Sequence, residues 1–166
     1  MRHALAGLVL AVLLGACAHG EVARGHIAVA REGATSLVVG SGLSQVRVRI
    51  TMRPADPHDI AAGGEMDETG YIVTRFVQRL EILVGPDRLY VPRSVFCDLF
   101  DLQTAELHIA PARSELTLTG ADAAESYIVK IEFDRQGVKR RTMASGEFPH
   151  SISQDTRYER FTVKDE

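Results

Sequence analysis

The sequence predicts a single antiparallel β-sandwich, immunoglobulin-like or barrel-like, with at most one short helix. Three observations support this fold class. Short runs rich in β-branched and aromatic residues recur at intervals of roughly 8–12 residues, and we count roughly nine or ten of them. Turns that contain glycine or proline separate these runs. Within the runs apolar and polar residues alternate, which is the period of a strand with one buried face.

The first 16 residues are expected to be a cleavable export signal. Arg2 gives a positive end, residues 4–14 are uncharged and apolar, and Gly15 and Ala16 are small, which is the layout of a secretory signal peptide. The apolar run is shorter than the roughly 20 residues that a transmembrane helix needs. We place the folded domain at residues 26–166, after a small, polar tether at residues 17–25.

The end of this segment, Leu14-Gly15-Ala16-Cys17, resembles the lipobox of bacterial lipoproteins. The resemblance implies that the Cys17 thiol is acylated and that the chain is cut before it, so that the lipid anchors the protein to a membrane. Because Ala18 and not aspartate follows, it also implies the outer membrane, facing the periplasm. Ordinary cleavage after Ala18, which would leave a soluble periplasmic protein, is the alternative.

The first half of the domain contains three expected strands and a long loop. Residues 26–30 and 35–39 are β-prone runs around a turn-like spacer, and we expect an opening hairpin. The clearest strand is 45–52, followed by a polar loop over 53–70. In that strand, one face carries Val46, Val48, Ile50 and Met52, and the other carries Arg47, Arg49 and Thr51.

Residues 71–84 fit two patterns. Ile72, Phe76, Leu80, Ile82 and Val84 support a strand, whereas Val73, Phe76, Val77, Leu80 and Leu83 have helical spacing. The β-branched start and the turn at 85–88 favour a strand. A short strand at 89–91 is expected to complete a hairpin, and Ser94 to cap one helical turn.

The second half alternates more regularly. Residues 105–109, 115–119 and 126–133 are expected strands. Residues 134–137 form a turn with glycine at a position of positive φ, leading into a strand at 138–143, and 157–163 is a last strand. Four side chains of the third strand are expected to point inward: Tyr127, Val129, Ile131 and Phe133.

Charge and cysteine content restrict the partners. Loss of the signal leaves 18 basic against 22 acidic residues, a mild negative balance that does not suggest a nucleic-acid partner. Cys97 is then the only thiol besides Cys17, and its apolar neighbours favour a buried side chain. Without a pair it forms no intramolecular disulfide.

Two kinds of candidate site stand out. The loop residues Asp56, His58 and Asp59 offer oxygen and imidazole ligands to a metal, although a solvated polar loop is the simpler interpretation. Basic residues on strands, able to hold carboxylates or phosphates, are candidates for ligand or partner binding, as are two residues of an exposed loop. These are Arg47, Arg49, Lys139, Arg140, Arg141, Phe148 and His150.

The alternatives are structural. The basic residues would pair across strands with Glu106, Glu115 or Glu132, and Phe148 would close one end of the core. His150 would be an ordinary surface histidine.

No nucleophile–base motif, redox pair or glycine-rich phosphate loop is present. We therefore expect a non-enzymatic envelope protein that binds another protein or an envelope component, and we assign no catalytic residue and no cofactor. Two alternatives stay open. One is a periplasmic hydrolase whose site is assembled in three dimensions from Asp56, His58, Asp59 and His150. The other is a periplasmic inhibitor or immunity protein.

Overall fold

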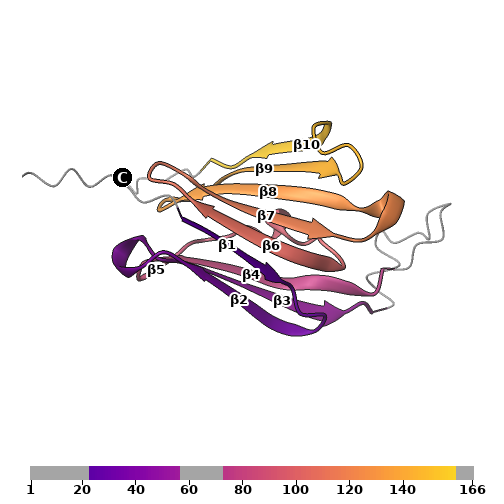
Figure 1. The fold of residues 1–166 in the computed structure, drawn as a ribbon, viewed down its shortest axis with the longest axis horizontal. Helices are drawn as coiled ribbons and strands as arrows, with labels where there is room; N and C mark the ends of the chain where they lie inside the picture. The colour runs from indigo at the N-terminus through magenta and orange to yellow at the C-terminus, as the bar shows by residue number, and fades with distance from the viewer. Residues whose placement is uncertain (1–22, 57–72, 160–166) are drawn as a thin grey trace, which may run out of the picture.

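The computed structural model describes residues 23–56 and 73–159. Within them the chain forms two antiparallel sheets that pack against each other, which confirms the predicted β-sandwich (Figure 1). Three 3-10 helices of one turn lie between strands, at Gly42–Ser44, Arg93–Val95 and Ala123–Glu125. The strands are β1 Ala23–Ala28, β2 Gly33–Val39, β3 Val46–Pro54, β4 Arg75–Val84, β5 Asp87–Arg88, β6 Leu102–Ile109, β7 Ser114–Gly120, β8 Tyr127–Asp134, β9 Gly137–Ser145 and β10 Ile152–Arg157.

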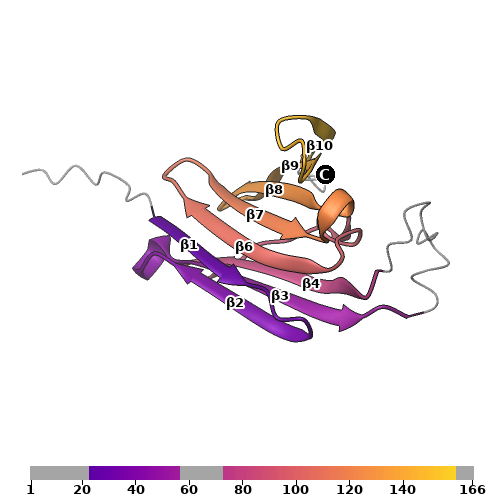
Figure 2. The same ribbon diagram turned by 45° about the vertical axis from the view of Figure 1, so that its right-hand side comes forward.

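The two sheets differ in width. One has six strands in the order β1-β6-β7-β8-β9-β10, and the other has four in the order β2-β3-β4-β5. Figure 2 shows these as two layers, with β9 and β10 at the far side of the wider sheet. Among the described residues, no helix is long and apolar enough to cross a membrane.

The expected opening hairpin is wrong. β1 pairs with β6 and β2 pairs with β3, so the two strands belong to different sheets. The link after β1 buries Val29, whose N–H donates to the carbonyl of Gln103, and this turns the chain from one layer to the other. β1 also starts at Ala23, inside the expected tether.

The strand prediction for β3 is confirmed. Its four apolar side chains are buried, whereas Arg47 and Arg49 are exposed on the outer face of the four-stranded sheet. The predicted strand within residues 71–84 is also confirmed over Arg75–Val84. Residues 57–72 lie outside the described residues.

A β-bulge changes which side chains of β4 face the core. Arg79 pairs with Thr51 while Val77 pairs with Met52, so Gln78 is an extra residue. Val77 and Leu80 are buried, and the two residues between them are both exposed. Phe76, expected on the face of Leu80, is only half-buried on the other side.

A buried carboxylate holds the start of β4. Asp101 accepts hydrogen bonds from the N–H and Oγ1 of Thr74, at 3.0 and 2.6 Å, and from Nε of Arg75 at 3.2 Å. Burying a charged carboxylate without such partners would cost roughly several kcal/mol. The contact therefore fixes the end of the sandwich at which β4 begins.

Several boundaries differ from expectation. β5 lies at Asp87–Arg88, before the expected strand, and the helical turn starts at Arg93 after Pro92 and has no side-chain cap. The β8–β9 turn is as predicted, with Gly137 at φ 145°. The last described strand is β10, and of the expected final strand only Arg157 belongs to it; residues 160–163 lie outside the described part.

The core lies between the sheets and receives side chains from both. Tyr127, Val129, Ile131 and Phe133 are buried, as predicted. Cys97 is exposed, so the expectation of a buried thiol is wrong. The cause is the one-turn geometry of this segment, in which the apolar residues on either side, Val95, Phe96 and Leu99, are buried in the core.

Candidate functional site

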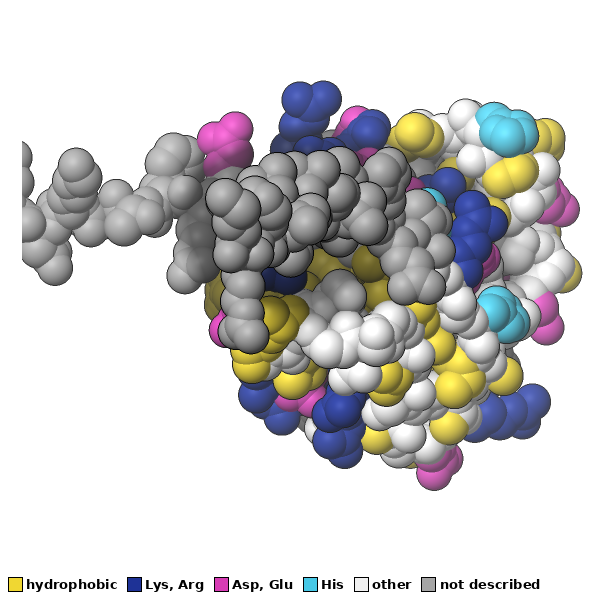
Figure 3. All heavy atoms as spheres, turned by 60° about the vertical axis from the view of Figure 1, so that its left-hand side comes forward, with side chains coloured by type: hydrophobic (Ala, Val, Ile, Leu, Met, Phe, Trp, Pro, Cys, Tyr) yellow, Lys and Arg dark blue, Asp and Glu magenta, His cyan; other side chains and the backbone are white. Residues whose placement is uncertain are grey.

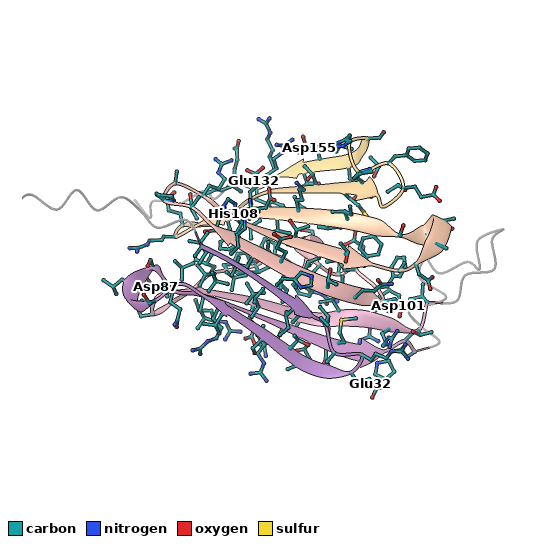
Figure 4. All side chains as sticks on the ribbon, in the orientation of Figure 1. Glu32, Asp87, Asp101, His108, Glu132 and Asp155 are labelled. Carbon is teal, nitrogen blue, oxygen red and sulfur yellow. The ribbon has the colours of Figure 1, made fainter. Side chains whose placement is uncertain are left out.

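The described residues form a groove of about 760 Å³. It lies between the outer face of β3 and β4 and the turn that contains Arg93–Val95. Four arginines line it, Arg49, Arg53, Arg79 and Arg93, together with one carboxylate, Glu81. We call it the arginine groove. In Figure 4, nitrogen-tipped side chains point away from the sandwich below the four-stranded sheet.

Strand alternation places three of the four arginines, and a turn places the fourth. Arg49 and Arg53 follow the alternation of β3, which puts every second side chain outward. Arg79 also faces outward by alternation, because the residues on the opposite face of β4, Leu80 and Ile82, are buried. Arg93 begins the 3-10 turn after Pro92, whose fixed φ suits the residue before a turn.

Among the described residues, arginines outnumber carboxylates in the lining of the groove. Glu81 forms ion pairs with Arg88 and, at 3.6 Å, with Arg79. Arg53 pairs with Asp56 at 3.6 Å, and its guanidinium lies over the Phe76 ring at 5.8 Å from the centroid. Arg49 and Arg93 form no ion pair with any residue of the described segments.

Such a lining can bind anions. A guanidinium offers a planar fork of donors and stays charged at physiological pH, so it attracts and orients oxyanions. For the same reason it neither gives up nor takes a proton readily. The groove is therefore suited to holding a negatively charged ligand.

The predicted basic residues are not brought together. Arg47 and Arg49 lie on the four-stranded sheet, whereas residues 139–141 lie on β9 of the other sheet. Arg49 lines the groove; Arg47 shares its outer face but lies outside the lining. In the view of Figure 3, dark blue basic side chains are spread around the visible surface and do not form a single patch.

Lys139 and Arg140 both pair with carboxylates, but only Arg140 pairs with one of the expected glutamates, Glu132. Lys139 Nζ is 3.3 Å from Asp134. Arg140 donates two hydrogen bonds of 2.8 Å to Asp155 and lies 3.5 Å from Glu132, labelled in Figure 4. The hydrogen bonds with Asp155 raise the pKa of Arg140 and lower the pKa of Asp155.

Arg141 is not part of an exposed basic patch, because its side chain is only 3% exposed. It donates to the carbonyl of Val95 at 3.1 Å, to Oε1 of Gln154 at 2.9 Å and to Oδ2 of Asp98 at 2.6 Å. The alternation of β9 turns it toward the turn that packs on this sheet. Arg141 thus joins the turn to β9 and β10.

Phe148 and His150 are exposed in the connection between β9 and β10. Phe148, at 65% exposed, does not close the core; it borders a hollow of about 360 Å³, which His150 does not line. Asp56 is exposed beside Arg53, and His58 and Asp59 lie outside the described residues. Within the described segments, no three His, Cys, Asp or Glu residues are grouped to hold a metal.

Sequence reasoning missed three of the four groove arginines. Arg53 continues the odd-numbered alternation of Arg47 and Arg49, and a strand extended by one residue would have included it. Arg79 lies on the outward face of the expected strand, opposite Leu80 and Ile82, and that alternation could have identified it. Arg93 comes close to the other three only through the fold. No protein family, curated protein or solved structure matches this chain.

Proposed function

We propose that this chain is an exported, lipid-anchored, non-enzymatic protein of the bacterial envelope that binds a negatively charged partner, either a protein or an envelope component. The observation that carries the binding role is the arginine groove. Its lining has four guanidinium groups against one carboxylate. A fixed excess of charge on strands suits binding better than proton transfer.

Anchoring is supported by the first residues of the chain. The sequence Leu14–Cys17 lies at the end of an apolar run, where a lipobox is expected. The first described strand begins at Ala23, a few residues after Cys17. An acyl chain on Cys17 would therefore hold the sandwich close to the membrane surface, and we place it at the outer membrane, facing the periplasm.

The test is intact-mass spectrometry and membrane fractionation in a bacterial host. We expect a mass that corresponds to cleavage before Cys17 plus acyl chains, and protein in the membrane fraction. Cys17→Ser should abolish both, whereas Cys97→Ser, at the exposed thiol, should change neither. An unmodified mature chain in the soluble periplasmic fraction would contradict the anchor.

A further inference from the structure

We infer that the arginine groove binds phosphate groups, two or more in one ligand. The inference of this ligand class rests on the proposed binding role and on the geometry of the groove. The cations come from three elements, β3, β4 and the 3-10 turn. A phosphate group carries three acceptor oxygens and up to two negative charges. A phosphate can therefore accept hydrogen bonds from guanidinium groups that approach from several sides. A carboxylate has only two oxygens, and both lie in one plane.

Two of the arginines lie on a fixed backbone, and one guanidinium is restrained before a ligand arrives. β3 is hydrogen-bonded on both sides, to β2 and to β4, so the backbone of Arg49 and Arg53 is fixed. The guanidinium of Arg53 also lies over the Phe76 ring, and such a cation–π contact restrains its position. Side chains that are already ordered lose less entropy on binding.

The groove is too long for a single phosphate. Arg49 and Arg53 are four residues apart on one strand, about 13 Å at roughly 3.3 Å per residue. Arg79 lies opposite Thr51, halfway between them. The row thus offers cations at intervals of about 7 Å, and several anionic groups in one ligand would occupy it.

Only part of this charge is neutralised within the described segments. Glu81 is shared between Arg79 and Arg88, and Asp56 is 3.6 Å from Arg53. Arg49 and Arg93 are therefore the groups with most to gain from an external anion. They are also the best positions for substitution, since neither forms an ion pair with residues 23–56 or 73–159 that a variant would break.

The test uses the purified full-length protein in a non-ionic detergent, titrated calorimetrically with inorganic tripolyphosphate. We expect saturable binding that Arg49→Gln and Arg93→Gln each weaken about tenfold, the usual consequence of losing one charge-assisted hydrogen-bonding group. Arg47→Gln is the matched control, because Arg47 is on the same strand and face but outside the groove. It should change the affinity less than twofold.

Thermal unfolding of the three variants should match that of the unmodified protein, so that a change in affinity reports on the groove. Citrate, a carboxylate ligand, should bind at least tenfold more weakly. Absence of tripolyphosphate binding, equal binding of citrate, or an equal loss with Arg47→Gln would overturn the inference. Those results would leave the anchor intact, because lipidation is measured separately at Cys17.

The source of the phosphate is resolved by competition. Detergent micelles that contain phosphatidylglycerol are added to the tripolyphosphate complex, with phosphatidylcholine micelles as the control. Displacement by phosphatidylglycerol alone identifies an anionic lipid headgroup as a source. No displacement, with tripolyphosphate binding retained, identifies a soluble phosphorylated ligand, and both results support a phosphate site.

Discussion

Adjacent residues on β9 have opposite environments. Arg140 lies on the outer face and forms ion pairs across the surface, whereas Arg141 is almost fully buried and bonds three partners. The alternation of a strand is enough to separate them. A run of three basic residues in a sequence is therefore not evidence of a basic patch when it lies on a strand.

This difference predicts different costs of substitution. Arg141→Met should lower the free energy of unfolding by about 1–3 kcal/mol, because it removes a buried side chain that donates three hydrogen bonds. Arg140→Met should lower it much less, as expected for an exposed ion pair that water screens. Urea denaturation measures both. Equal costs would mean that the turn at Arg93–Val95 is not held by Arg141.

The Arg140–Asp155 pair predicts a pH dependence. Hydrogen bonds from Arg140 lower the pKa of Asp155, so the pair stabilises the folded state above the ordinary range of an aspartate, and this contribution is lost as the pH falls through the lowered value. Carboxyl NMR should find that the pKa of Asp155 lies below the ordinary range of an aspartate. Arg140→Gln should move its midpoint up; an unchanged midpoint would contradict the pairing. The effect on stability should be small, because both groups are solvent-screened.

At the scale of elements, the alternation of apolar and polar residues predicted the strands well, but it did not predict which strands pair with each other. β3 and β8 bury the side chains that were expected, because in each strand a single register turns every apolar side chain toward the core. β1 and β2 were expected to pair, yet they face each other across the core. Gly25 explains how they come close, since a Cβ there would lie 2.4 Å from Val39 Cγ2. Alternation identifies the buried face of a strand. It does not distinguish two strands that form a hairpin from two strands that lie in different sheets, because both pairs show the same alternation.

The pairing of β7 with β8 depends on another glycine, Gly120, which lies opposite Tyr127. A Cβ on Gly120 would lie 2.4 Å from the ring of Tyr127, whose hydroxyl donates to the Phe100 carbonyl and accepts from the Phe100 N–H. Gly120→Ala should therefore destabilise the fold by about 1–3 kcal/mol, the range for overpacking. Ser36→Ala, at an exposed position of β2, should change stability by less than about 0.5 kcal/mol. Similar values for the two variants in chemical denaturation would show that Tyr127 can move aside.

At the scale of the whole molecule, the sandwich class was predictable and the groove was not. The class follows from local repetition of short alternating runs. The groove needs a bulge in β4, a turn stacked beside it and the outer face of β3, and these meet only after the sheets have formed. Arg49 could be proposed from the sequence because its alternation is local, whereas Arg93 is separated from it by a hairpin and a turn.

The shared core predicts that both sheets unfold together. Ile82 of β4 and Leu118 of β7 come from different sheets, are almost fully buried and belong to one hydrophobic cluster. Neither sheet can shield its inner face without the other, so unfolding should be a single transition. Ile82→Ala and Leu118→Ala should each lower its free energy by about 2–5 kcal/mol.

Two probes can follow this transition separately. Circular dichroism reports on the strands of both sheets, and tyrosine fluorescence includes Tyr127 of the six-stranded sheet. The two curves should coincide in the unmodified protein and in both variants, with only the midpoint shifted. If Ile82→Ala instead produced a separate early step seen by circular dichroism but not by fluorescence, the four-stranded sheet would be a unit of lower stability. The arginine groove, built on that sheet, would then be lost before the rest of the fold.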